Sequence, residues 1–280
     1  MYKKKPLVTV VIPTYNPKEI LKRALKSVEK QTYKNIEVIV VDDNYPETKD
    51  ESFFSEFKLN IKYICLSANK GACYARNKGI EESKGEFIAF LDDDDVFKET
   101  KIEKQVNHML LNPSCPLVIC FTLDLRVGKG RLVRPPEIIT HKSLLKGFKL
   151  STTSSYLARK SALNQIKKDE GYYFDTNLAT NHEYDLALRL SENNDIYCLQ
   201  EALMIRNKSE GQLSENWTKK IKGQLLLFKK YYKEYSKLGF KGLIFQYIRF
   251  IGLLTLFTAG FILGNRIYKF MYLIIGITKK

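Results

Sequence analysis

Four short apolar runs, separated by stretches with helical periodicity, occupy the first hundred residues of the chain. The runs lie at 7–12, 36–41, 61–65 and 86–91, and the first of them is rich in β-branched residues. The helical patterns between them lie around 17–30, 47–58 and 71–83. Strands that alternate with helices form a parallel sheet with right-handed crossovers. The sequence therefore predicts an α/β fold.

The polar residues that follow these runs are the first candidates for a binding site. Ligands of open α/β sheets bind beyond the carboxyl ends of the strands. That rule selects four short segments, which are 13–16, 42–44, 67–71 and 92–95.

The last of these segments is a run of four aspartates, from Asp92 to Asp95, directly after an apolar strand. Neighbouring carboxylates repel one another and raise each other's pKa, so the run is costly unless something binds there. Mg²⁺ and Mn²⁺ prefer carboxylate oxygens and usually share them with substrate phosphates. Because alternate side chains of an extended segment point to opposite sides, we expect Asp92 and Asp94 to face one site and Asp93 to turn away.

The second half of the chain has a mixed pattern. A hairpin is expected at 117–134, helices around 137–146, 184–190 and 215–235, and strands around 155–159 and 196–205. We expect one catalytic domain over residues 1–212, with a nucleotide-binding half at 1–110 and an acceptor half at 111–212. Residues 213–280 are expected to form a separate C-terminal tail.

Cysteine usage is typical of a reduced, cytosolic protein. The five cysteines are odd in number and no pair has C-x-x-C spacing, so neither a disulfide framework nor a zinc site is predicted. No signal peptide is expected, because the first apolar run is too short and leads directly into Pro13.

The tail combines positive charge with apolar sequence. The net charge of the chain is +15, and eight lysines between 219 and 241 precede an apolar run at 243–264 that is long enough to cross a bilayer. A second apolar run at 270–277 is too short to cross alone. Lysines flank both ends, so we expect an in-plane or re-entrant segment on the anionic cytoplasmic leaflet. The alternatives are a solvated basic helix and a buried helix or oligomer interface; the oligomeric state stays open.

Four ordered motifs within about residues 6–103 resemble those of family 2 glycosyltransferases. They are Val8-Thr9-Val10-Val11-Ile12-Pro13-Thr14-Tyr15-Asn16, Val40-Val41-Asp42-Asp43-Asn44, Asn69-Lys70-Gly71 with Ala75-Arg76-Asn77, and Leu91-Asp92-Asp93-Asp94-Asp95. The resemblance implies a GT-A fold, which is Rossmann-like with a mostly parallel central sheet and flanking helices. It also implies a nucleotide-sugar donor, a divalent cation (Mn²⁺ or Mg²⁺) and inversion at the anomeric carbon.

The resemblance also implies roles for individual residues. The substrate- and nucleotide-binding set is Pro13, Thr14, Tyr15, Asp43, Gly71, Arg76, Asp92 and Asp93. Within it, Asp43 is expected to bind the base edge, most simply uracil N3–H, and Gly71 to let backbone approach the nucleotide. Arg76 braces the donor site or forms a structural ion pair with the aspartates. Asp92 reaches the ribose or the metal, and Asp94 is the metal ligand.

The catalytic base is expected in the second half of the chain. Residues 181–190 resemble the family's acidic pair and D-L-x-x-R-L helix, with the pair replaced by His182-Glu183. Glu183 is therefore the expected base, with Asp185 as the alternative, although Asp185 is expected to pair with Arg189. The HExxH zinc motif is excluded because Leu186 occupies its second histidine position.

A loop that often begins with a metal-binding histidine in this family begins here with Asn207. Metal binding then rests on Asp94 with diphosphate and water, or Lys208 contacts phosphate; the sequence leaves both open.

The sequence as a whole predicts a glycosyltransferase that moves a sugar, most simply from a UDP-sugar, to a glycan or lipid-linked acceptor in cell-envelope polysaccharide or glycoconjugate synthesis. The expected location is the cytoplasmic face of the cell membrane, with no nucleic-acid partner. A metal-dependent nucleotidyltransferase is one alternative, but the segment at 13–17 lacks the glycines of such enzymes. A nucleic-acid-binding protein is the other, suggested by charge alone.

Overall fold

The structure is a computed structural model that describes residues 5–15, 18–44, 51–126, 130–147, 150–178, 180–207 and 217–263. Parts of several predicted features lie outside the described residues. These are Asn16, the start of the helix expected at 47–58, the hairpin tip at 127–129, the loop at 208–214 and the apolar run at 270–277.

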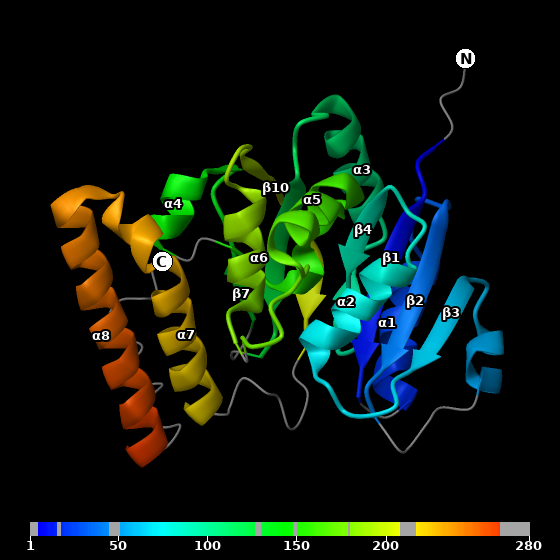
Figure 1. Cartoon of the computed structure of the whole chain (residues 1–280). Helices are drawn as coiled ribbons and strands as arrows, with labels where there is room; N and C mark the ends of the chain where they lie inside the picture. Colours follow the sequence, from blue (N-terminus) through cyan, green and yellow to red (C-terminus); the bar gives the residue numbers. More distant parts are fainter. Residues whose placement is uncertain are drawn as a thin grey trace.

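Within the described residues, one ten-stranded sheet forms the centre of the molecule (Figure 1). The main strand order is β3-β2-β1-β4-β9-β6-β10-β5, while β7 pairs with β6 and β8 pairs with β10. The strands of the first half are β1 (Val8–Thr14), β2 (Ile36–Asp42), β3 (Asn60–Cys65), β4 (Phe87–Phe90) and β5 (Asp95–Phe97). Those of the second half are β6 (Leu117–Asp124), β7 (Arg131–Val133), β8 (Ile138–Ile139), β9 (Leu157–Arg159) and β10 (Ile196–Arg206).

The predicted parallel sheet is confirmed for the first half of the chain. Strand β1 pairs in parallel with β2 and β4, and β2 pairs in parallel with β3. The second half adds the parallel pair β6–β10 and the antiparallel strands β9, β5, β7 and β8. The carboxyl ends of β1, β2 and β4 consequently meet at one edge, as the position of the predicted site requires.

Helices cover both faces of this sheet because successive side chains of each strand point to opposite faces. On one face, Val10 and Ile12 of β1 belong to a core cluster shared with helices α1 and α3. On the other face, Val11 belongs to a cluster shared with α2, α5 and α6. The helices are α1 (Lys18–Glu29), α2 (Ala72–Glu82), α3 (Lys101–Leu111), α5 (Lys160–Glu170) and α6 (His182–Leu190), and the 3₁₀ turns are η1 (Glu51–Glu56) and η2 (Thr153–Ser155).

The helix expected around 137–146 begins later, as α4 (His141–Lys146). The Thr140 side chain caps this helix by accepting a hydrogen bond from the backbone N–H of Ser143 at 3.0 Å. Residues 138 and 139 instead pair with β10 as strand β8, which uses their backbone groups in the sheet.

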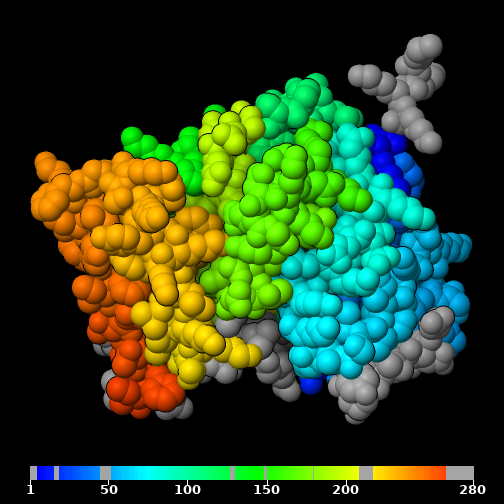
Figure 2. All heavy atoms as spheres, viewed as in Figure 1, coloured from blue at the N-terminus to red at the C-terminus, as the bar shows by residue number. Residues whose placement is uncertain are grey.

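The part of the tail that the structure describes, residues 217–263, forms two long helices, α7 (Trp217–Ser236) and α8 (Gly239–Leu263), which lie side by side at the end of the molecule opposite β3 (Figures 1 and 2). Phe228 of α7 stacks on Phe250 of α8, with ring centroids 4.2 Å apart. The outer side of α8 is apolar and exposed, with Phe240 at 80% and Ile248 at 65%. Of the described helices, only α8 is long and apolar enough to cross a bilayer, with a mean hydropathy of 1.5 over Gly239–Ile262.

The first helical residue of α3, Lys101, gives a pH-dependent stability prediction. It is fully buried, its Nζ donates to Gln105 Oε1 at 2.7 Å, and burial lowers the pKa of Lys101 to about 8 from 10.5. Between about pH 8 and 10.5 the unfolded chain therefore binds more protons than the folded one. Burial of the charged lysine consequently lowers the free energy of unfolding by its full amount below pH 8 and has no effect above pH 10.5.

We expect Lys101→Met to raise the free energy of unfolding at pH 7 by about 2 kcal/mol. The gain should vanish near pH 11, where the lysine is neutral in both states. Urea unfolding at the two pH values measures it, and a Met variant that is less stable than the parent at pH 7 would show that the lysine contributes net stability.

Candidate active site

The ends of β1, β2 and β4 are joined by hydrogen bonds at the predicted site. The backbone N–H of Asp43, just after β2, donates to the carbonyl of Thr14 at the end of β1 at 2.9 Å. The Thr14 hydroxyl in turn donates to Asp93, after β4, at 2.7 Å. Pro13 is buried within β1, whereas the Tyr15 side chain is 53% exposed beside this edge. The structure thus brings the predicted nucleoside-binding residues to one place.

The Asp43 carboxylate stabilises the loop that precedes α2 by accepting two backbone hydrogen bonds. One of its carboxylate oxygens accepts the backbone N–H of Lys70 and the other that of Gly71, both at 2.6 Å. A Cβ added at Gly71 would have open space around it, but its φ of +86° lies in the region that favours glycine. The requirement for glycine is therefore the backbone turn that presents the N–H to Asp43. Each carboxylate oxygen of Asp43 keeps a further lone pair, so its contact with a base edge stays a proposal.

The side chains of the acidic run diverge. Asp92 forms an ion pair with Arg76 at 2.5 Å, while Asp93 turns to Thr14. Asp95 accepts a hydrogen bond from the Ser154 hydroxyl at 2.6 Å, and its other oxygen is buried without a hydrogen-bond partner. Asp92 and Asp93 therefore point to different partners, as expected, whereas a shared site for Asp92 and Asp94 stays a prediction.

Burial and mutual repulsion perturb these carboxyl groups. Burial, reinforced by the charges of Asp94 and Asp92, raises the pKa of Asp93 to about 6. Burial and the same neighbours raise the pKa of Asp95 well above its usual value. Burial acts in the same direction on Asp92, but Arg76 outweighs it and holds the pKa of Asp92 below its usual range. The turn therefore concentrates negative charge that a cation would neutralise.

The residues at this turn fit a divalent cation that is shared with a substrate. The partnerless oxygen of Asp95 and the raised pKa values are the features expected of carboxylates near a hard cation. Across the described residues, no group of three or more His, Cys, Asp or Glu side chains is arranged to hold a metal by itself. Mg²⁺ and Mn²⁺ commonly take one or two carboxylates and complete their shell with phosphate and water, which this turn allows.

Asn207 lies against the acidic turn. Its side-chain amide donates to the main-chain carbonyl of Asp94 at 3.1 Å, and Arg23 of α1 donates to the same carbonyl at 3.0 Å. The residue in the position of the family's histidine is therefore beside the expected metal ligand, although an amide nitrogen cannot replace an imidazole as a ligand.

The expected base, Glu183, lies in the first turn of α6. Asn181, which precedes this helix, has a φ of 64° and is the only described non-glycine residue with positive φ. Asparagine tolerates that conformation better than most residues, and such backbone strain concentrates at functional sites. His182 Nε2 lies 3.1 Å from Arg76 Nη1 and 3.6 Å from Glu183 Oε2. Arg76 thus touches the acidic turn with one nitrogen and the residue next to Glu183 with the other.

Accessibility separates the two candidate carboxylates of α6. The Glu183 side chain is 24% exposed, whereas Asp185 is completely buried and pairs with Arg189 at 2.7 Å, as the i,i+4 spacing predicts. Only Glu183 is therefore open to an acceptor.

Two further residues shape the site and are not among those predicted. The Ser154 hydroxyl accepts the backbone N–H of Asp92 at 3.0 Å as well as donating to Asp95. Arg206, at the end of β10, is paired in register with Asp95, and its charge lowers the pKa values of Asp92 and Asp95. The available signals were the polar run at 151–155 before an apolar strand and an arginine at a strand end.

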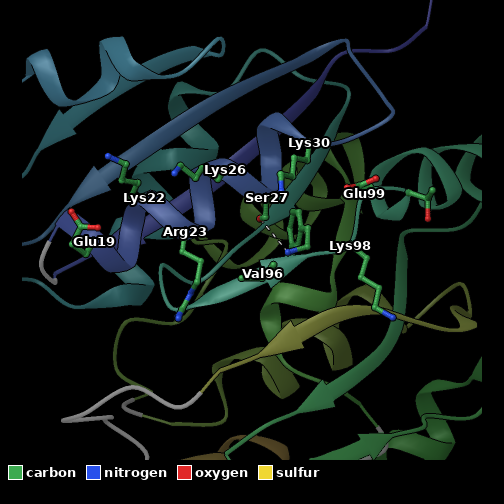
Figure 3. Close-up of a pocket in the computed structure, with 11 residues that line it drawn as sticks. Glu19, Lys22, Arg23, Lys26, Ser27, Lys30, Val96, Lys98 and Glu99 are labelled. Carbon is green, nitrogen blue, oxygen red and sulfur yellow. Dashed lines mark hydrogen bonds between the residues drawn. The ribbon is translucent and has the colours of Figure 1, made fainter.

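A positively charged cavity of about 960 Å³ lies beside the acidic turn (Figure 3). It is formed between α1 and residues 96–100, which directly follow the acidic turn. It is lined by Glu19, Lys22, Arg23, Lys26, Ser27, Lys30, Val96, Phe97, Lys98, Glu99 and Thr100. None of these residues is in the predicted donor-binding set. The cavity adjoins the site at Arg23, which donates to the Asp94 carbonyl, and at Val96, which follows Asp95 in the chain.

Known proteins are similar to this chain in sequence and in fold. The sequence profile described as Glycosyl transferase family 2 matches residues 9–185. The UDP-Glc:alpha-D-GlcNAc-diphosphoundecaprenol beta-1,3-glucosyltransferase WfgD of Escherichia coli is 30% identical over 224 residues, which are 78% of this chain and 83% of the relative.

Two solved structures resemble most of this chain in fold. TarS 1-349 of S. aureus in complex with UDP-GlcNAc has a TM-score of 0.61 at 20% identity, over 79% of this chain and 66% of that one. The mannosyltransferase PcManGT from Pyrobaculum calidifontis, in complex with GDP-Man and Mn²⁺, has a TM-score of 0.58 at 16% identity, over 82% and 64%. At these identities the likeness concerns the fold. Together with the profile match, it shows that this chain belongs to glycosyltransferase family 2 and has the GT-A fold.

Proposed function

We propose that the chain transfers one sugar, with inversion, from a UDP-sugar to a glycan or lipid-linked acceptor. The observation that carries the proposal is the contact of Arg76 with both Asp92 and His182. Through it, the donor-binding half is connected directly to the turn that bears Glu183. Inverting transfer needs a leaving diphosphate on one side of the sugar and a single base on the other, and this arrangement supports both.

In the proposed reaction, Glu183 takes the proton from an acceptor hydroxyl as its oxygen attacks C1 of the sugar, and the bond from C1 to the diphosphate oxygen breaks. Asp94 would hold a Mn²⁺ or Mg²⁺ ion, which supplies positive charge to the departing diphosphate when it is bound. Asp43 and Gly71 would hold the loop before α2 in place beside the nucleotide. Pro13, Thr14 and Tyr15 would line the nucleoside pocket. Arg76, Asp92 and Asp93 orient the donor.

We further propose the division into a catalytic domain at 1–212, with halves at 1–110 and 111–212, and a membrane-binding tail at 213–280. The acceptor is proposed to be lipid-linked, since the name of the E. coli relative specifies a diphosphoundecaprenol acceptor. The apolar outer side of α8 supports attachment to a membrane, and the lysines of α7 support its anionic cytoplasmic face.

A donor panel tests the proposed activity. The full chain is incubated with UDP-, GDP-, dTDP- and CMP-sugars, with Mn²⁺ or with EDTA, and the released nucleotide is measured. We expect release from one UDP-sugar that EDTA abolishes. Equal release in EDTA would contradict the metal. If no donor is turned over and UDP fails to bind in the presence of Mn²⁺, the proposal is wrong.

The membrane proposal has its own test on the exposed side of α8. Replacing Ile248 and Ile251 with glutamate places two charges on the surface proposed to enter the lipid, so we expect sedimentation with phosphatidylglycerol vesicles to fall at least about tenfold. The matched control is Leu111→Glu, because Leu111 is an equally apolar, 82% exposed residue on α3. Vesicle binding that survives the double substitution would exclude α8 as the anchor.

A further inference from the structure

The buried carboxylate of Asp185, two residues after Glu183, receives its hydrogen bonds from two different helices. Arg189, on α6 itself, donates to Oδ2 from Nη2 at 2.7 Å and from Nε at 3.1 Å. On the other oxygen, Oδ1 lies 2.5 Å from Lys230 Nζ and accepts the Tyr231 hydroxyl at 2.8 Å. A carboxylate offers about four acceptor positions, so these four contacts complete it.

The contacts from α7 extend beyond that carboxylate. The Lys230 ammonium also bonds the Tyr172 hydroxyl at 2.9 Å and lies 3.4 Å from Asp175. Burial lowers the pKa of Lys230, but Asp185 outweighs it and the net shift is upward, so the ammonium stays charged. The hydroxyl of Tyr231, which is itself buried, lies 3.3 Å from the main-chain carbonyl of Asp185. Both side chains therefore contact the first turn of α6 from outside that helix.

Only an outside contact can position this turn. The Arg189–Asp185 pair lies within α6, and Arg189 also contacts Glu170 at the end of α5 and the carbonyls of Tyr172 and Tyr173 just after it. The turn also begins at Asn181, whose left-handed backbone persists only where its surroundings over-determine it. Elsewhere in the turn, Tyr156 donates to the Glu183 carbonyl at 3.3 Å and Arg76 contacts His182. The contacts that Lys230 and Tyr231 of α7 make with Asp185 are therefore a third set of contacts to this turn from outside α6.

We propose that Lys230 and Tyr231 are positioning residues that orient Glu183 by holding Asp185. They do not touch substrate; they fix where the first turn of α6 presents its exposed carboxylate. This inference rests on the proposed role of Glu183 as the base. It also makes α7 part of the active-site framework, although α7 lies outside the matched family segment of residues 9–185.

The test compares adjacent residues of α7 with opposite orientations. We expect Lys230→Met to lower kcat for sugar transfer or donor release about 30-fold and Tyr231→Phe about tenfold, because small displacements of a catalytic group cost factors of this size. UDP affinity and donor KM should stay within about twofold. Lys230→Arg should recover most of the lost kcat. Lys229→Met and Tyr232→Phe should match the parent, because Lys229 is exposed and Tyr232, 42% exposed, contacts Phe228 and Tyr247 rather than Asp185.

A double-mutant cycle separates positioning from general destabilisation. In a Glu183→Ala background, Lys230→Met should cause no further loss, because the two residues act in one step. Losses that multiply, or a parallel fall in UDP affinity, would overturn the inference. If Lys230→Met does not fold, Tyr231→Phe decides. Full turnover by Glu183→Ala would instead refute the proposed base. If Glu183→Ala loses turnover while the Lys230 and Tyr231 variants keep the turnover of the parent, only this inference is refuted.

Discussion

Replacing Glu183 with alanine is expected to lower sugar transfer by about 10²- to 10⁴-fold, the contribution typical of a positioned general base. Without this carboxylate, the acceptor hydroxyl loses the accessible group that is proposed to take its proton. UDP affinity in the presence of Mn²⁺ should be unchanged, since the proposed donor contacts come from Asp43, Arg76 and the acidic turn. Steady-state turnover and UDP titration on the same preparation measure the two effects.

The matched control for this substitution is Glu192→Ala, because Glu192 is an exposed carboxylate shortly after the same helix. We expect its turnover to equal that of the parent. Turnover retained by Glu183→Ala would remove Glu183 as the base and leave Asp185 as the remaining candidate on α6.

Replacing Arg76 with methionine is expected to lower both stability and turnover. Arg76 is 3% exposed, and burial lowers its pKa while Asp92 raises it, with a net upward shift. Removing the guanidinium leaves Asp92 without its ion-pair partner; because the Asp92 side chain is 29% exposed, the cost in unfolding free energy is at most about 3 kcal/mol, the lower end for a fully buried pair. It also disconnects His182 from the acidic turn, so we expect turnover per folded molecule to fall at least about tenfold.

Lys78→Met controls for the loss of a cation from the same helix. Lys78 pairs with Glu82 at 2.7 Å on the exposed side of α2, so its removal should cost less than about 1 kcal/mol and leave turnover unchanged. Urea unfolding and donor turnover measure both variants. An Arg76 variant that behaves like the Lys78 variant would show that the connection between the two halves is not needed.

The parallel part of the fold follows directly from the sequence, because a run of β-branched residues bounded by polar ones has few other structures available. The same reasoning cannot find β5, whose three residues include the buried Asp95 and owe their extended structure to pairing with β10. Two helices, α3 and α5, were not among the predicted elements, although Ile102, Val106 and Met109 have helical spacing on α3.

The site was predictable only to the level of its strand-end motifs. That Thr14, Asp43 and Asp93 lie together follows from parallel pairing, which brings strand ends to one edge. The link from Arg76 to His182 depends on how α2 packs beside α6, and the link from Lys230 to Asp185 on how α7 packs on α6. These pairs are separated by 106 and 45 positions in the chain, and no periodicity encodes such contacts.

The anomeric configuration of the sugar at the moment of its release is the most direct test of displacement assisted by a single base. The active UDP-α-sugar identified by the donor panel is mixed with the full chain, and the anomeric proton of the product is followed by NMR before mutarotation equilibrates it. We expect the β-anomer to appear first, since one displacement at C1 inverts its configuration. Initial formation of the α-anomer would contradict this mechanism, because it requires either two displacements or attack from the side of the departing diphosphate.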